Sequence, residues 1–219
     1  MDHQRRHQPD GGRHGVRGVA AVEDLPKEGL KLPSRPVIET GSLVLRLVEK
    51  GDLPALFAVN GDEEVVRYSP RESWKTAADG EAWFAKIMEY RSTGATLQFV
   101  ITLRDGGHPI GTMALFHFDE SVRSAEVGYV LARSLWGKGL MKEALAATVA
   151  FAFDVLGLKR LEAELDPRNA ASAKVLERVG FTHEGHRRRN YCSKGEITDT
   201  GLYGMLREDP RPVIPSRRL

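Results

Sequence analysis

The sequence predicts an α/β or α+β fold built around one mixed β-sheet. Apolar residues alternate with period two in several segments and recur at helical spacing in others. The order is strand, two helices, antiparallel strands, then strand–helix–strand–helix and closing strands. Because parallel strands need a long crossover and antiparallel strands need only a turn, this order predicts both kinds of pairing in one sheet. The chain has 219 residues, of which 41% are hydrophobic, which fits one domain with a substantial core.

The first part of the predicted domain contains a strand, two helices and a hairpin. Leucines alternate with other residues over 43–47, which predicts a strand. Asp52 is expected to cap a short helix, and Thr76 to start a longer one that ends near Gly94. Two strands joined by a Gly-rich turn are expected at 97–103 and 110–118.

The second part predicts strands that alternate with helices. A strand over 125–131 precedes a wide apolar helical stripe over 140–156, which Gly157 closes. A strand over 158–165 leads to a helix over 169–179, which Gly180 stops. Two or three further strands are expected within 181–206.

Both ends of the chain differ from this body in composition. Residues 1–35 are rich in Arg, His and Gly and lack apolar periodicity, so we expect a disordered tail. Residues 209–219 are rich in Pro and Arg and are expected to form a second tail. The folded domain is therefore expected to span residues 36–208.

The composition also excludes several classes of function. Lys and Arg together number 32 and Asp and Glu 30, and this balance does not favour nucleic acid or an anionic membrane as the partner. Cys192 is the one cysteine, so an intrachain disulfide and a cysteine-based zinc cluster are excluded, and no metal site is expected. The sequence has no apolar run of membrane-spanning length and no secretory signal, so a cytoplasmic location is expected.

The most informative segment is the turn that contains Gly137 and Gly139, between the strand 125–131 and the long helix. Glycines let backbone approach a ligand closely, and the first amides of a helix have no intrahelical acceptor. The turn therefore predicts a seat for phosphate or pyrophosphate. It is not a P-loop, because Ala132 stands where that motif needs its first glycine, and Lys142 stands where a dinucleotide fingerprint needs its third glycine.

The surrounding motifs resemble those of the GCN5-related N-acetyltransferases. The resemblance rests on EVGYVL and LWGKGLMKEAL (126–131 and 135–145) together with RNAASAKVLERVGF (168–181). The segments IETGSLVLRLVEKGD and KGEITDTGLYGML also resemble the branch that acetylates the N-termini of ribosomal proteins. Over about residues 38–207, the resemblance implies a mostly antiparallel sheet of six or seven strands, about four helices, and one strand pair that splays apart.

The resemblance also implies a site for acetyl-CoA and assigns residues to it. Asn169 would lie near the thiol end of the cofactor, and Ser172 would donate a proton to the leaving thiolate. Ser172 is equally consistent with a capping role in the first helical turn. Ser134 departs from the Gln or Arg that the wider superfamily favours there. The pantetheine arm would pair with Tyr129, Val130 and Leu131, and the pyrophosphate would meet the amides of Trp136, Gly137, Lys138, Gly139, Leu140 and Met141.

Glu126 is the candidate general base, acting directly or through a chain of water molecules. It begins the strand that leads to the glycine turn, and it shares one sheet face with Gly128 and Val130. A solvent-facing strand end is the alternative. His117, between Phe116 and Phe118, is interpreted as a structural histidine, with a place in the acceptor pocket as the alternative.

The implied reaction is acetyl transfer to a primary amine. An α-amine has a pKa of about 7.7–8.0, so roughly a quarter is neutral near pH 7.4, whereas only about 0.1% of a lysine amine is neutral. An α-amine acceptor therefore needs only a weak base, which favours a protein N-terminus, and a ribosomal one given the branch. The alternatives are a small amine or antibiotic acceptor and a non-catalytic CoA-binding regulatory module. A monomer or homodimer is expected.

Overall fold

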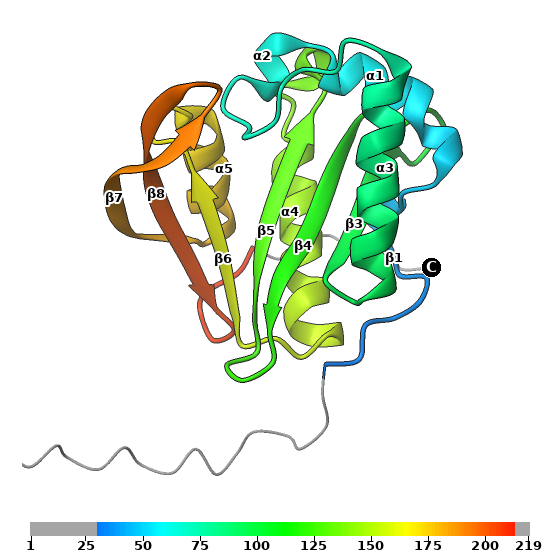
Figure 1. The fold of residues 1–219 in the computed structure, drawn as a ribbon. Helices are drawn as coiled ribbons and strands as arrows, with labels where there is room; N and C mark the ends of the chain where they lie inside the picture. Colours follow the sequence, from blue (N-terminus) through cyan, green and yellow to red (C-terminus); the bar gives the residue numbers. More distant parts are fainter. Residues whose placement is uncertain (1–29, 213–219) are drawn as a thin grey trace, which may run out of the picture.

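The computed structural model describes residues 30–212, whose centre is an eight-stranded sheet (Figure 1). Its strand order is β1-β2-β3-β4-β5-β6-β8-β7. Among the described strand pairs, β5 and β6 are parallel and all others are antiparallel. The predicted mixed, mostly antiparallel sheet is confirmed, with more strands than the six or seven expected. The strands are β1 (Val37–Glu39), β2 (Leu43–Leu47), β3 (Thr96–Leu103), β4 (Gly111–Asp119), β5 (Ser124–Leu131), β6 (Arg160–Leu165), β7 (Thr182–Ser193) and β8 (Glu196–Leu206).

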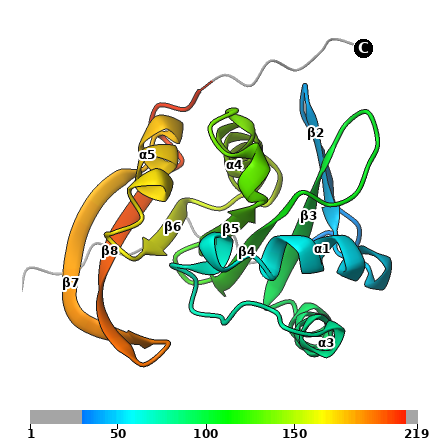
Figure 2. The same cartoon turned by 90° about the horizontal axis from the view of Figure 1, so that it is seen from above.

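Helices cover both faces of the sheet. Figure 2 shows α4 and α5 on one face and α1 and α3 on the other. A π-helical turn, Phe151–Val155, continues α4 until Gly157 ends the segment with φ 70°. The helices are α1 (Leu53–Asn60), α2 (Glu63–Val66), α3 (Ala77–Ser92), α4 (Leu140–Ala150) and α5 (Ala170–Val179).

The continuous apolar run of β3 is explained by burial on both of its faces. Phe99 and Ile101 belong to the main core with α4, and the ring of Phe99 meets that of Phe151 edge-on at 6.0 Å. Val100 points the other way, into a second core with residues of α1 and α3. The two cores fix the sheet between its helical layers.

Asp52 is the N-cap residue of α1, as the sequence predicts, but its side chain has a different partner. Its side chain makes no capping bond to α1. Its carboxylate instead accepts hydrogen bonds from both terminal guanidinium nitrogens of Arg46, at 2.9 and 2.7 Å, and from the Glu49 amide at 2.8 Å. Because Asp52 is buried, this ion pair replaces water as the partner of its charge.

The expected tails fall mostly outside the described residues, which exclude 1–29 and 213–219. Leu30 and Leu32 pack against the main core. Near the other end, Arg211 pairs with Asp154 at 3.2 Å and lies over the ring of Phe153. Among the described residues, no helix combines the length and apolar character that crossing a bilayer requires.

Candidate active site

Strands β5 and β6 pair over a short stretch and then separate. Ser124 to Glu126 pair with Arg160 to Glu162, after which β5 continues to pair with β4 and β6 with β8. Figure 1 shows the two strands diverging above this point. We call the region where β5 (from Val127 onward) no longer pairs with β6 the fork. It confirms the splayed strand pair expected from the sequence, and Glu126 lies at its closed end.

Residues of β5 alternate between the two faces of the sheet at the fork. Val127 is buried in the main core and Tyr129 packs against that core, on the side of α4 and α5. Glu126 and Gly128 face the other side, where α2 packs against β5 and the Phe116 ring lies over Gly128. The side chains of Tyr129 and Glu126 therefore lie on opposite faces of the sheet at the fork.

The turn that follows β5 depends on backbone conformations that favour glycine. Gly137 and Gly139 have φ values of 74° and 80°, and Gly139 is the N-cap of α4. A Cβ atom at either position would meet nothing within 4 Å, so glycine is required here by backbone conformation rather than by space. The Trp136 indole donates to the Leu131 carbonyl at 2.8 Å and ties the turn to the end of β5.

The amides of this turn divide into bonded and available groups. Those of Leu135 and Trp136 donate to the carbonyls of Ala132 and Arg133 within a 3₁₀ turn. The next amide to find a backbone acceptor is that of Glu143, which donates to Gly139. Within the described part of the chain, the amides of residues 137–142 have no protein acceptor, which leaves a group of available donors at the positive end of α4.

The sequence left two roles open for Ser172, which are a cap of α5 and a hydroxyl beside the cofactor. The structure gives the capping role to Asn169. The Asn169 side chain accepts from the Ser172 amide at 3.1 Å and is the cap of α5. The Ser172 hydroxyl instead lies 2.9 Å from the hydroxyl of Tyr129, in a hydrogen bond in which either can donate. The Ser172 hydroxyl is thus held beside β5 rather than used as a cap.

The Tyr129 hydroxyl is a group that the sequence reasoning missed, because the family resemblance assigned only its backbone. Burial raises the pKa of Tyr129 to about 12, so the phenol stays protonated at neutral pH. Strand alternation placed Tyr129 on the face opposite Glu126, but nothing in the sequence showed that its hydroxyl reaches α5. The two hydroxyls form a neutral, hydrogen-bonded pair on the α5 side of the fork.

On the opposite face, Glu126 is partly buried and paired with a histidine. Its side chain is 21% exposed, and its Oε2 lies 2.9 Å from His117 Nδ1. Burial raises the pKa of Glu126, the bond with His117 opposes that rise, and the charges of Glu164 and Glu162 add to it. Its raised pKa makes this carboxylate, at the closed end of the fork, a stronger base than an exposed glutamate.

The β7–β8 hairpin and the α2 region meet beside the fork. Lys194, at the hairpin turn, donates through Nζ to the Val66 carbonyl at 2.7 Å. Arg168, which precedes α5, lies over the ring of Tyr68 at 6.0 Å and pairs with Glu196 of the hairpin at 2.9 Å. These contacts place α2 and the hairpin together beside β5 and β6.

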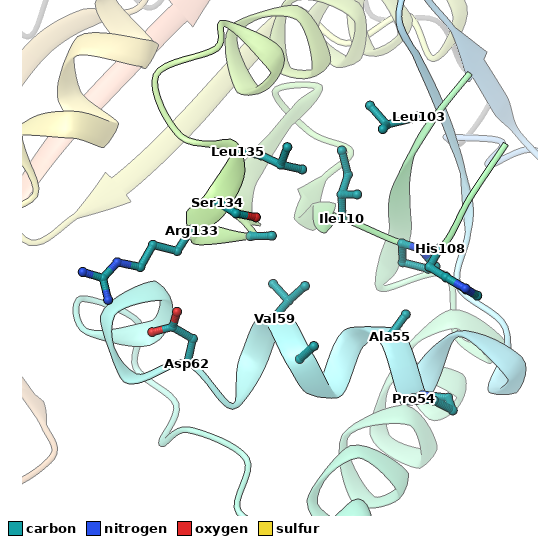
Figure 3. A pocket seen from close by; sticks show the side chains of 13 residues that line it. Pro54, Ala55, Val59, Asp62, Leu103, His108, Ile110, Arg133, Ser134 and Leu135 are labelled. Atoms are coloured by element: carbon teal, nitrogen blue, oxygen red, sulfur yellow. The ribbon is translucent and has the colours of Figure 1, made fainter. Parts of the chain in front are cut away.

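A separate groove with a volume of about 1150 Å³ lies on the other flank of the glycine turn. It runs between α1, the β3–β4 turn and residues 132–135. Figure 3 shows the side chains of Val59, Ile110 and Leu135 pointing into it. Its lining includes none of the site residues expected from the sequence, so the groove borders the turn without containing the fork.

A family comparison decides the identity of this arrangement. The family model described as an acetyltransferase (GNAT) domain matches residues 42–182. The chain belongs to the GNAT acetyltransferase family. The match spans β2 to the start of β7 and includes the fork, the glycine turn and α5. The resemblance seen in the sequence is confirmed, and this GNAT protein is an N-acetyltransferase.

Several proteins illustrate the range of the family. An uncharacterized N-acetyltransferase, p20 of Bacillus licheniformis, is 29% identical over 78% of this chain and 96% of its own. The ribosomal protein uS5-alanine N-acetyltransferase of Escherichia coli is 28% identical over 60% of this chain and 69% of its own. The spermidine N(1)-acetyltransferase of Vibrio cholerae is 24% identical over 72% of this chain and 88% of its own.

A solved structure shares the fold with this GNAT protein. Mycobacterium smegmatis RimJ in complex with CoA-disulfide superposes with a TM-score of 0.70 and 26% identity, over 78% of this chain and 86% of that one. The overall fold of this chain is therefore shared with another acetyltransferase whose structure has been solved with a CoA derivative.

Proposed function

We propose that this protein transfers the acetyl group of acetyl-CoA to the α-amine of a protein N-terminus. One observation carries the proposal: β5 and β6 separate at Glu126, which leaves a base on one face of the fork and the Ser172 hydroxyl on the other. A thioester held between the two strands would lie between a proton acceptor and a proton donor, which is the arrangement that acyl transfer to an amine needs.

The residues around the fork fit acetyl-CoA. From Tyr129 to Leu131, β5 has no partner in β6, so its backbone edge is available to the amides of the pantetheine arm. The unbonded amides of residues 137–142 lie at the start of α4 and suit the pyrophosphate. The Trp136 amide already donates to the Arg133 carbonyl, so it is not available to the pyrophosphate. Trp136 instead holds the turn in place through its indole. Asn169 orients Ser172 from the cap of α5.

When bound, acetyl-CoA supplies an activated acetyl thioester. Glu126 removes the proton from the attacking amine, directly or through one water molecule. Ser172, hydrogen-bonded to the protonated Tyr129, donates a proton to the departing thiolate, and the Ser172–Tyr129 pair regains one proton from solvent before the next turnover. Each positioned proton transfer is worth about 10²–10⁴ in rate.

The chemistry of the base favours an α-amine as the acceptor. Glu126 is a carboxyl group and therefore a weak base, and about a quarter of an α-amine is already neutral near pH 7.4. The named acceptor of the Escherichia coli relative, an alanine of a ribosomal protein, supports this choice. We place the reaction in the cytoplasm, where nascent N-termini appear, with the protein acting as a monomer or homodimer.

A small polyamine is the second candidate acceptor. The Vibrio cholerae relative is named for spermidine, and Glu162 and Glu164 of β6 lie close enough to Glu126 for their charges to act on it. These carboxylates would attract an acceptor that carries additional positive charge.

Purified protein with acetyl-CoA and defined acceptors distinguishes these functions. The acceptors are a peptide that begins with alanine, the same peptide with a blocked N-terminus and a free lysine, and spermidine. Free thiol release gives the rate and mass spectrometry gives the acetylated position. The proposal predicts transfer to the first peptide, none to the second, and loss in Glu126→Gln. Transfer to spermidine alone would overturn the protein N-terminus in favour of the second candidate.

A further inference from the structure

His117 occupies an unusual backbone conformation in the middle of the sheet. Its φ is 51°, in the left-handed region, although it is not glycine and lies within β4. The β4–β5 pairing is regular up to Phe116 opposite Glu126 and resumes with Asp119 opposite Ser124, so β4 bulges at residues 117 and 118. Conformations of this kind cost free energy, and such strained positions and bulges are enriched next to functional sites.

The bulge brings the His117 ring to Glu126. In a regular ladder the cross-strand neighbour of Glu126 is Phe116. The extra residue instead sets His117 Nδ1 2.9 Å from Glu126 Oε2, and the Phe116 ring supports the imidazole edge-on at 4.7 Å. The sequence interpretation of His117 as a structural histidine does not account for this contact.

The His117–Glu126 pair extends from the fork to solvent. The Glu126 side chain is 21% exposed and that of His117 is 76% exposed. The imidazole therefore has one nitrogen on the catalytic carboxylate and most of its surface in water.

Glu126 needs such an exit for protons. In the proposed reaction it gains one proton per turnover and must lose it before the next. The charged groups that influence it are His117 of β4 and the carboxylates Glu162 and Glu164 of β6. The negative charges of those two carboxylates make deprotonation of Glu126 harder. Glu162 pairs with Arg160, and Glu164 pairs with Arg187. Among these neighbours, only His117 both touches Glu126 and reaches solvent.

We infer that His117 is a positioning residue that passes the proton of Glu126 to bulk water after each transfer. The inference rests on the proposed function. The neutral imidazole accepts the proton from the Glu126 carboxyl at Nδ1 and loses a proton from Nε2 to water or buffer. The side chain then returns to its original tautomer by rotation or by a second exchange with solvent. One proton enters from the amine, one leaves to solvent, and no electron is transferred.

The substitution His117→Asn separates proton transfer from simple orientation. Asparagine adopts the left-handed conformation readily, and its side-chain amide lies where Nδ1 lies, so the bond to Glu126 is kept. It cannot take up and release a proton. We expect kcat to fall by about tenfold or more, with a changed pH profile and unchanged affinity for acetyl-CoA by calorimetry. His186→Asn is the matched control, because His186 pairs with Asp199 at 2.7 Å away from the fork.

His117→Gly provides the second test. Glycine relieves the strained backbone and leaves a solvent-open space beside Glu126, so free imidazole should restore much of the lost kcat. A structural role predicts no such rescue. In an enzyme that is active as the wild type, normal kinetics of His117→Asn, or a His117→Gly variant that imidazole does not rescue, would overturn the relay alone. A wild-type protein that acetylates no amine would overturn the proposed function and the relay with it.

Discussion

The hydroxyl oxygens of Tyr129 and Ser172 lie 2.9 Å apart and join β5 to α5 across the buried face of the fork. Tyr129 comes from the strand edge that we assign to the pantetheine arm, and Ser172 from the first turn of the helix that Asn169 caps. Because burial raises the pKa of Tyr129 to about 12, the pair holds its protons throughout the physiological range. The pair is therefore not a base for the amine, and in the proposed reaction it acts only on the side of the departing thiolate.

Removal of the Ser172 hydroxyl should slow transfer without weakening acetyl-CoA binding. In Ser172→Ala we expect kcat to fall by about 100-fold or more with an unchanged KM for acetyl-CoA, because only the proton donor is lost. Tyr129→Phe should cost less, since the serine hydroxyl remains. Steady-state thiol release measures both.

The double variant tests whether the two hydroxyls act as one unit. If Tyr129 works through Ser172, the double variant should be no slower than Ser172→Ala alone. Losses that multiply would contradict this coupling and would give Tyr129 an independent role.

Glu126 should make the folded protein less stable as pH rises. Its folded pKa is raised above the ordinary value of 4.5, so the folded state holds this proton more tightly than the unfolded state does. The resulting stabilisation is fully present below pH 4.5 and is lost as pH rises through the folded pKa. Glutamine stays neutral, so Glu126→Gln should lose activity and yet gain stability relative to wild type as pH rises.

Urea unfolding between pH 4 and pH 8 measures this effect for both proteins. Glu120→Gln, at an exposed turn residue, is the control and should follow the wild-type pH dependence. If the stability difference between wild type and Glu126→Gln stayed constant over the range, burial would not be the dominant influence on this carboxyl.

The sequence predicted the elements whose signals repeat over several residues. The helix that begins at Leu140 and the strand β2 each bury one face, so their apolar residues recur with the period of a helix and of a strand. The three residues of β1 and the four of α2 are too few to show a period. Asp52 fits the composition of a helix cap, but its partner Arg46 precedes the helix, and a local pattern does not reveal that pairing.

The sequence predicted the parts of the candidate site that depend on local backbone conformation. It did not predict the contact between side chains of the neighbouring strands β4 and β5. Gly137, Gly139 and Asn169 have the local roles that their residue types favour. Glu126 was placed on the correct face by strand alternation. Its partner His117 depends on a bulge that inserts one extra residue into β4, and no residue type in that segment marks the insertion.

The Arg46–Asp52 pair should stabilise the fold without serving catalysis. Asp52 is buried and accepts three hydrogen bonds, so Asp52→Ala leaves a guanidinium and an amide without their acceptor. Because Arg46 is 35% exposed and water can reach it, we expect a loss of about 2–3 kcal/mol rather than the larger cost of a fully buried pair. Chemical denaturation measures the loss, and kcat and KM at permissive temperature should not change. A loss below about 0.5 kcal/mol would place the pair among surface ion pairs.

Gly139 should matter for acetyl-CoA binding beyond its effect on stability. Alanine at this position meets no neighbour within 4 Å, so its cost is that of a left-handed backbone, about 1–2 kcal/mol. Gly106, in the β3–β4 turn, has φ 89° and the same open surroundings, and Gly106→Ala is therefore a matched control. Both variants should lose similar stability, but only Gly139→Ala should weaken acetyl-CoA binding, by about tenfold, because relaxation of its backbone turns the amides of residues 137–142 away from the pyrophosphate. Calorimetric titration with acetyl-CoA separates the two variants, and equal affinities would show that the turn does not hold the ligand.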